Sequence, residues 1–562
     1  MSAVHAVSPS LNGAARRLDG AVPKPVSAPG AMGRGHRGTP APAFDRHGIA
    51  DLVRRVREPV HVVQDARTGV LGLAGGGDVD YGGPDPAHRL LGSLPGLYPE
   101  WLGDRSFCAA HGTRFPYVAG EMAKGIATTR LVLAMARAQM LAYFGAAGLS
   151  LTDVERAVDE LSGELGPSSP NWGVNLIHMP GEPELEARLA ALLVTRGVRR
   201  ISASAFMDLT PAVVRCAASG LRLDPAGRIV RHTHLFAKVS RPEVAGKFMS
   251  PAPADLLAAL VSRGELTAAE AELASRVPIA QDVTVEADSG GHTDNRPLTV
   301  LLPAILALRD RLTARFGYES AIRVGAAGGL GSPEAVAAAF ALGAAYVMTG
   351  SVNQAAVEAG LCDEAKRMLA QVDLADMVMA PCSDMFELGV KVQVVRRGTM
   401  FAARASQLYE TYRAYPGLDA VPAPLRGRLE RDVFRAPLDQ VWADTRSYWQ
   451  RRDPGQVDRA ERDPKHRMAL VFRWYLSKSS SWAIAGDPAR RMDYQIWCGP
   501  AMGAFNRWTA GSFLAEPANR SAVQIALNLL EGAAVVTRAQ QLRSYGVPVP
   551  PEAFAFMPRR LR

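Results

Sequence analysis

An alternation of short apolar strands with amphipathic helices constrains the fold of this chain most. From about residue 105, eight stretches rich in β-formers follow one another, each ending in a Gly-rich or polar loop: 116–120, 140–146, 172–178, 199–204, 235–240, 282–288, 322–328 and 345–351. Helical stretches lie between them, and strands that alternate with helices indicate parallel pairing. Eight such units over roughly 250 residues predict an α/β fold, the (β/α)₈ barrel. A doubly wound open sheet is the competing arrangement.

The segments around the barrel complete the predicted organisation. The pattern at 59–77 predicts a β-hairpin, and the segment after the eighth strand is predicted to be helical and is rich in charged residues. Because this helical segment follows the eighth strand, we expect it to fold over the catalytic face as a lid. The predicted units are a disordered arm at 1–44, a β-rich segment at 45–104, the barrel at 105–354, the helical insertion at 355–480 and a C-terminal helical segment at 481–562.

Composition excludes several classes of protein. A hydrophobic content of 48% and a charged content of 21% are typical of a soluble globular chain. No apolar run approaches the roughly 20 residues that cross a bilayer, and no secretory signal is visible, so we expect a cytoplasmic protein. The five cysteines lie far apart without a C-x-x-C pair, which argues against a metal site or a disulfide framework.

The charge of the chain bears on its partners. The net charge is +9, yet no basic run is interleaved with aromatic residues, which disfavours nucleic acid. A mildly basic surface suits an acidic protein partner or a phosphorylated ligand. Within the helical insertion, four arginines are either a landing site for an acidic protein or a solvated face: Arg396, Arg397, Arg404 and Arg413.

Two Gly-rich loops carry the most informative pattern. Active sites of this fold lie at the carboxyl ends of the strands, and a phosphate site recurs after strands seven and eight. GAAGGLGSPE (325–334) and TGSVNQ (349–354) occupy those two positions. Glycines there allow backbone amides to approach a ligand, and the following helix N-termini favour an anion. The alternative is that the glycines only make tight turns.

The loop EADSGGHTDNR (286–296) follows the sixth strand. His292 within it is suited to act as proton donor or base, because the pKa of histidine lies near working pH. The alternative is a histidine that only pairs with its neighbours Asp288 and Asp294. We expect Asp294, Asn295 and Arg296 to hold the loop.

Two further polar residues follow apolar strands. Lys238 ends the fifth strand, where a buried ammonium needs an anionic partner. It either supports the N1–C2 carbonyl edge of a flavin or pairs with a carboxylate such as Glu286. Asn175, in the third strand, either hydrogen-bonds a cofactor or caps its own loop.

Long motifs in a fixed order resemble those of the PfaD family, the trans-acting enoyl reductases of polyketide and polyunsaturated-fatty-acid synthases. The resemblance covers residues from about 50 to 545. Its motifs are GVNLIHMPGEPELE, SASAFMDLTPAVV, AKVSRPEVAGKFMSPAP, EADSGGHTDNRPLTVLLP, GAAGGLGSPEAVAAAFALGAAYVMTGSVNQA, MAPCSDMFELGVKVQVVRRGTMFAARA and DYQIWCGPAMGAFN. More distantly, the barrel resembles nitronate monooxygenases and flavin-dependent enoyl-carrier-protein reductases, which share the Gly-Gly-His loop.

The resemblance implies an FMN-bound barrel that takes hydride from NADPH. The reduced flavin then delivers hydride to the β-carbon of a 2-enoyl thioester carried on an acyl carrier protein. His292 matches the catalytic histidine of the nitronate enzymes, and in a reductase it either protonates the α-carbon or orients the substrate. The expected cofactor-binding residues are Met122, Asn175, Lys238, Gly290, Gly291, Gly328, Gly329, Gly350 and Ser351, of which the last four would bind phosphate.

The first strand's loop departs from the family pattern. There the family reads Gly-Ala-Met-Ala-Asn-Gly, whereas this chain has GEMAKG at 120–125. Glu121 and Lys124 are expected either to pair with each other across the loop or to alter cofactor affinity.

Two other functions compete with trans-acting enoyl reduction. Oxidation of alkyl nitronates would use the same flavin and histidine, but it needs no docking platform of the size of the helical insertion. A non-catalytic scaffold would need neither the phosphate loops nor His292. The sequence leaves the oligomeric state open, with a homodimer as one option.

Overall fold

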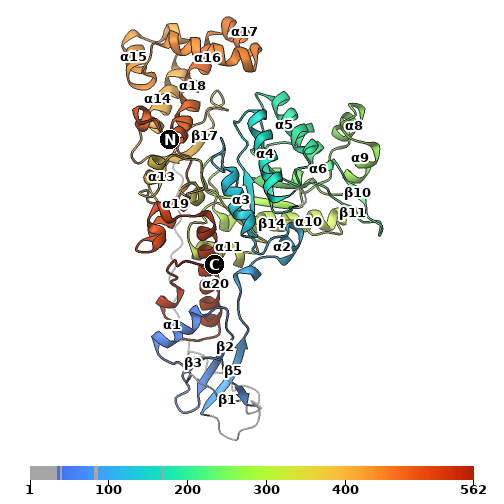
Figure 1. Cartoon of the computed structure of the whole chain (residues 1–562), viewed down its shortest axis with the longest axis vertical. Helices are drawn as coiled ribbons and strands as arrows, with labels where there is room; N and C mark the ends of the chain where they lie inside the picture. Colours follow the sequence, from blue (N-terminus) through green and yellow to red (C-terminus); the bar gives the residue numbers. More distant parts are fainter. Residues whose placement is uncertain (1–34, 38–40, 77, 81–86, 167–168) are drawn as a thin grey trace, which may run out of the picture.

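The computed structural model describes residues 35–37, 41–76, 78–80, 87–166 and 169–562. Figure 1 shows an elongated molecule: a small sheet lies at one end, a group of helices at the other, and the barrel projects from the side between them. Most of the arm predicted at 1–44 falls outside the described residues. The strand β1 (Gly35–Arg37) nevertheless pairs with the N-terminal sheet, so the ordered β-rich segment starts before residue 45.

Eight parallel strands close into a barrel, which confirms the predicted (β/α)₈ fold. In the barrel order, β15 pairs with β6 and so joins the last strand to the first. All eight predicted strands are present, and each begins and ends within two residues of its expected position. They are β6 (Tyr117–Ala119), β7 (Leu141–Phe144), β8 (Trp172–Ile177), β9 (Arg200–Ser204), β12 (His234–Val239), β13 (Asp282–Glu286), β14 (Arg323–Ala327) and β15 (Val347–Thr349).

Aromatic side chains fill the barrel interior. Tyr143, Phe236 and Tyr346 are fully buried, and the ring centroids of the two tyrosines lie 5.4 and 5.7 Å from that of the central Phe236. Phe107, from the helix that precedes β6, stacks on Tyr346 at 4.4 Å. The interior is therefore a packed core and no pore, as this fold requires, and ligand space is left only at the rims.

Helices surround the barrel between successive strands. The predicted helix at 184–197 is α5 (Pro183–Thr195), and the one at 333–343 is α11 (Pro333–Ala341), whose first residue is a proline as expected at a helix start. The others are α3 (Thr129–Arg137), α4 (Leu151–Leu165), α6 (Pro211–Ala218), α7 (Pro242–Phe248), α8 (Ala254–Ser262), α9 (Ala268–Ala274), α10 (Leu298–Phe316) and α12 (Ser351–Gln354).

The last long helix joins the N-terminal sheet to the barrel. α20 (Ala522–Ser544) packs so closely on α11 that a Cβ on Gly532 would lie 2.5 Å from Pro333 Cγ. At its other end the buried Arg538 donates to the carbonyl oxygens of Val56 and Pro95. The sheet holds the predicted hairpin and further strands: β2 (Val60–Asp65), β3 (Leu71–Gly75), β4 (Asp78–Asp80) and β5 (His88–Leu94), next to the helix α1 (Arg46–Arg54).

The insertion is mainly helical and contains one hairpin that the sequence did not predict. The strands β16 (Met377–Pro381) and β17 (Lys391–Val395) pair antiparallel. Its helices are α13 (Asp363–Leu369), α14 (Phe401–Ala414), α15 (Ala423–Arg428), α16 (Leu438–Arg452), α17 (Pro454–Arg462) and α18 (Pro464–Ala485). The boundary proposed at residue 480 falls inside α18, which continues toward α19 (Ala501–Thr509).

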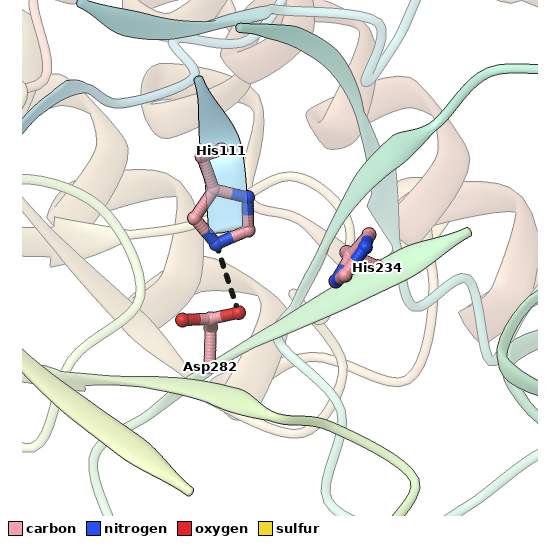
Figure 2. A group of neighbouring side chains, drawn as sticks. All are labelled: His111, His234 and Asp282. Atoms are coloured by element: carbon pink, nitrogen blue, oxygen red, sulfur yellow. Dashed lines mark hydrogen bonds and ion pairs between the residues drawn. The ribbon is translucent and has the colours of Figure 1, made fainter. Parts of the chain in front are cut away.

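A buried polar cluster closes the amino-terminal end of the barrel. His111 ends α2 (Arg105–His111), and its Nε2 lies 3.1 Å from Asp282 Oδ2 at the start of β13 (Figure 2). Arg323, which begins β14, donates to both oxygens of Asp282 at 2.6 and 2.7 Å. Arg200 Nε donates to His111 Nδ1 at 3.2 Å, so the proton of a neutral His111 lies on Nε2 and points to Asp282.

This cluster is suited to hold the fold together and unsuited to a cation. The ligand atoms of His111, His234 and Asp282 lie within 4.8 Å of one another, and Figure 2 shows His111 and Asp282 directed at each other with His234 beside them. However, both oxygens of Asp282 are engaged, and the guanidinium groups of Arg200 and Arg323 would repel a metal ion. Burial lowers the pKa of His111, and it also holds His234 neutral by lowering its pKa to about 2.

We predict that Asp282→Asn lowers the free energy of unfolding by about 3–5 kcal/mol, because it leaves Arg323 buried without its charge partner. Urea unfolding followed by circular dichroism measures the change. Asp310→Asn is the control, since that carboxylate is 67% exposed and pairs with Arg309 at the surface; about 0.5 kcal/mol or less is expected there. Equal losses in the two variants would contradict a structural role for the cluster.

Candidate functional site

A cavity of about 630 Å³ opens at the carboxyl ends of the barrel strands. Every one of the eight strand ends contributes to its wall, and so does the helical insertion. The ten residues that the sequence singled out all line it: Met122, Asn175, Lys238, Gly290, Gly291, His292, Gly328, Gly329, Gly350 and Ser351. The fold therefore brings these residues together, while their individual roles stay predictions.

Lys238 lies between two carboxylates at the cavity floor. Its Nζ is 3.1 Å from Glu121 Oε1 and 3.4 Å from Glu286 Oε1. Burial alone would lower the pKa of Lys238, but the two carboxylates outweigh burial and raise it, so the ammonium keeps its charge. Burial also raises the pKa of Glu286. The pairing with Glu286 is the one that the sequence suggested, and Glu121 is a second partner.

The expected pair between Glu121 and Lys124 does not form. Lys124 instead donates to Ser477 O and Ser480 Oγ of α18, each at 2.7 Å. Burial lowers the pKa of this ammonium to about 8. The two unusual residues of the first loop thus have different partners. Glu121 pairs with Lys238 on the cavity floor, and Lys124 binds the loop to the insertion.

The loops after β14 and β15 present free backbone amides to the cavity. Within the described residues, the amides of Gly329, Gly350 and Ser351 donate no hydrogen bond. A Cβ on Gly329 or Gly350 would meet no atom within 4 Å, so both glycines face open space. Gly328 differs, since its Cβ would lie 2.7 Å from the carbonyl carbon of Ala287. Gly328 therefore serves backbone packing, and its neighbours leave a cradle that an anion would fill.

The Gly-Gly-His loop is held by the hairpin of the insertion. Gln393 N, in β17, donates to Gly291 O at 3.4 Å, and Cys498 N donates to Gln393 O at 3.2 Å. Gly290 has to be glycine, because a Cβ would lie 2.8 Å from Cys498 N. Gly291 has φ +93° and faces open space. Segments far apart in the sequence thus fix the position of His292.

His292 forms an ion pair with a residue of the insertion. Its Nε2 lies 3.2 Å from Asp384 Oδ2, on the loop between β16 and β17. Burial alone would lower the pKa of His292, but Asp384 outweighs it and raises that pKa, and His292 in turn lowers the pKa of Asp384 to about 2. The carboxylate of Asp384 therefore favours the doubly protonated form of the His292 ring.

The pairing that the sequence offered as the simpler explanation for His292 is wrong. Asp294 binds Arg241 and Ser240 of the β12–α7 loop, at 2.6 and 3.0 Å. The carboxylate of Asp288 has an oxygen without a hydrogen-bond partner among the described residues. Asp294 thus holds the loop, as expected, and Asp384 is the partner of His292.

Asn175 donates from Nδ2 to Ser202 O and to Ser204 Oγ, both at 2.9 Å. Its amide NH₂ group therefore braces the neighbouring strand, and only its carbonyl oxygen is available for a ligand. Ser351 Oγ accepts from Gly499 N at 3.1 Å. This bond ties the last loop of the barrel to the segment that precedes α19.

The insertion supplies the outer part of the cavity. Arg452 Nε donates to Glu182 Oε2 at 2.6 Å across the mouth, and Arg473 lies 3.3 Å from Glu387. Trp449 and Leu388 add apolar surface. The sequence analysis expected the insertion to cover this face, but it identified none of the insertion residues that line the cavity, Asp384 included. The four arginines that it offered as a landing site are not among the residues that line the cavity. Arg404 pairs with the buried Asp493, and Arg397 pairs with Asp376.

Comparison with known proteins agrees with this geometry. In the crystal structure of the enoyl reductase domain of MlnA, from the macrolactin biosynthesis cluster of Bacillus amyloliquefaciens, the aligned sequence is 35% identical and the TM-score is 0.75. The match covers 99% of that domain and 79% of this chain.

The chain belongs to the PfaD family.

Relatives of this PfaD chain are parts of larger proteins. It is 46% identical over 450 residues to one of the polyunsaturated fatty acid synthase proteins of Thraustochytrium, and 42% identical over 450 residues to the polyketide biosynthesis protein PksE of Bacillus subtilis. These matches cover about four fifths of this chain, but only 30% and 58% of the relatives' lengths.

A second match falls on the insertion. Residues 415–494 match the inserted helical domain of [acyl-carrier-protein] S-malonyltransferase. The PfaD chain thus combines an enoyl-reductase-type barrel with a helical unit known from a second kind of protein.

Among the described residues, no helix is both long enough and apolar enough to cross a membrane.

We predict that Asp384→Asn lowers the pKa of His292, because the imidazolium loses the carboxylate that stabilises it. Histidine-resolved NMR titration of the protein measures this pKa, with His292→Gln identifying the signal. Glu410→Gln is the control, since Glu410 is an exposed residue of α14 outside the cavity lining. An unchanged His292 titration in Asp384→Asn would show that the ion pair has no effect in solution.

Proposed function

We propose that this protein is a trans-acting, FMN-dependent enoyl reductase that uses NADPH to reduce 2-enoyl thioesters carried on an acyl carrier protein in polyketide or polyunsaturated-fatty-acid biosynthesis. The observation that carries this proposal is a single cavity that joins an anion cradle, a charged floor, the His292–Asp384 pair and an outer arm under the helical insertion. The relationship to an enoyl reductase domain supports the same reaction class.

The residues at the cavity floor fit a flavin mononucleotide. The free amides of Gly329, Gly350 and Ser351 would bind its phosphate, and the open faces of Gly329 and Gly350 leave the space for it. Lys238 would support the ring, with Met122 and the carbonyl of Asn175 nearby. When bound, FMN reduced by NADPH supplies a hydride to the β-carbon of the enoyl thioester.

A side chain of the protein supplies the proton that must reach the α-carbon. Asp384, at Nε2 of His292, stabilises the doubly protonated ring, which leaves the Nδ1 proton for donation. Gly291 positions the ring by its backbone bond to β17. Because the acid form of His292 is the active one, the rate should fall as pH rises through its raised pKa.

The outer cavity suits a substrate longer than a nitronate. A nitroalkane anion would occupy only the floor, whereas the cavity extends between α5 and the helices α16–α18. Since the insertion matches a domain of an enzyme named for an acyl-carrier-protein substrate, a carrier-borne acyl chain is the substrate that best fits this second wall.

The purified protein tests the proposal directly. We expect a yellow protein that oxidises NADPH in the presence of crotonyl thioesters and longer enoyl thioesters. A colourless protein that cannot be reconstituted with FMN would rule out flavin chemistry. Turnover of alkyl nitronates without enoyl reduction would assign the barrel to nitronate oxidation.

We predict that His292→Gln retains flavin but loses enoyl reduction by about 10²–10⁴-fold, the usual contribution of a general acid. Stopped-flow oxidation of the NADPH-reduced protein by crotonyl thioester measures this step apart from flavin reduction. His232→Gln serves as the control, since His232 is exposed before β12 at the opposite end of the barrel. Normal turnover in His292→Gln would show that another group supplies the proton.

A further inference from the structure

Three arginines from successive helices line the outer end of the cavity. Arg452 ends α16, Arg459 lies in α17, and Arg473 lies in α18. None of them belongs to the barrel, and none is part of the floor described above. The insertion thus places three guanidinium groups at the mouth of a cavity whose reactive end lies in the barrel.

These arginines keep donors available for a ligand. A guanidinium has five N–H donors. In the ion pairs described above, Arg452 uses its Nε for Glu182 and Arg473 uses its Nη1 for Glu387. In the part of the chain that the structure describes, the one ion pair of Arg459 is with Asp463 at 3.9 Å, and its side chain is 64% exposed. Planar guanidinium groups bind phosphate oxygens in pairs, which lysine cannot do.

The two ends of the cavity differ in charge. At the outer end, the lining side chains include three arginines against Glu182 and Glu387. On the floor, Lys238 pairs with Glu121 and Glu286, His292 pairs with Asp384, and Lys124 is bound to Ser477 and Ser480 of α18. Apart from the amide cradle, the floor therefore offers no unpaired positive charge to an anion. An anionic group on a long ligand is attracted instead to the arginines at the mouth.

Apolar side chains from both walls line the rest of the cavity. Met179, Leu185 and Leu189 come from the barrel side, and Leu388 and Trp449 from the insertion. A ligand that is anionic at one end and uncharged along its length fits this distribution.

We propose that Arg452, Arg459 and Arg473 form a binding site for the phosphodiester of the phosphopantetheine arm that carries the acyl chain. The carrier protein is too large to enter the cavity, so its phosphate stays at the mouth while the thioester reaches the floor. This inference rests on the proposed function, since it assumes a carrier-borne substrate, and it adds the residues that recognise the arm.

Two synthetic substrates that differ only in the phosphate test the site. Crotonyl-phosphopantetheine and crotonyl-pantetheine are compared at saturating NADPH, in the FMN-loaded wild type and in Arg459→Gln. We expect KM for the phosphorylated substrate to rise about ten-fold in the variant, the loss of one charge-assisted hydrogen bond. The kcat, and KM for crotonyl-pantetheine, should stay within about two-fold of the wild type.

Matched variants separate the site from general charge effects. Arg446→Gln removes a positive charge from the same helix as Arg452, but Arg446 pairs with Glu461 outside the cavity lining, so no change in KM is expected. Arg459→Lys keeps the charge without the planar fork and should recover only part of the affinity. Equal flavin content in all variants shows that the barrel is intact.

The outcomes distinguish the two proposals. If the wild type reduces neither thioester, the proposed function fails, and the phosphate site with it. Reduction of both substrates with the same KM in wild type and Arg459→Gln would overturn the phosphate site alone. The KM for NADPH is measured separately at saturating crotonyl-phosphopantetheine. If Arg459→Gln raises that KM and leaves the KM for the thioester unchanged, these arginines bind the nucleotide's phosphate, which would likewise overturn the inference.

Discussion

Closure of the parallel sheet is the constraint on which the rest of the structure depends. Once β15 pairs with β6, all eight strands point the same way around one ring, and their carboxyl ends have to meet at one rim. The aromatic side chains of Tyr143, Phe236 and Tyr346 fill the interior. Ligand space is thereby confined to that rim, and residues spread from Gly120 to Ser351 share one cavity.

Charged side chains are buried at both ends of the barrel, but the two ends differ in how completely these side chains are hydrogen-bonded. At the amino-terminal end, Asp282 has both oxygens bound, so its cluster is closed and serves stability. At the carboxyl end, Lys238 neutralises two carboxylates incompletely, and polar atoms of Glu121 have no hydrogen-bond partner among the described residues. Buried polar groups that are left unsatisfied in a native protein call for an explanation. A ligand that completes the floor provides one.

Sequence periodicity was sufficient to predict the barrel, because strand and helix alternate with local patterns that each segment carries by itself. Counting strand ends also placed the loops of the ten site residues at one rim, while the family resemblance selected the residues themselves. Sequence periodicity could not find Asp384, since the pairing with His292 depends on how the β16–β17 hairpin folds back onto the barrel. The same limit applies to Glu121 and Lys124, whose partners Lys238 and Ser480 lie in distant segments.

The insertion is therefore part of the site as much as a cover over it. Without β17, Gly291 would lose the backbone contact that sets the loop, and without the β16–β17 loop His292 would lose Asp384. Burial favours a neutral imidazole at His292, which has no second proton to give. The carboxylate that reverses this preference belongs to the same insertion that lines the cavity mouth with arginines. The insertion thus affects both the protonation of His292 on the cavity floor and the charge at the cavity mouth.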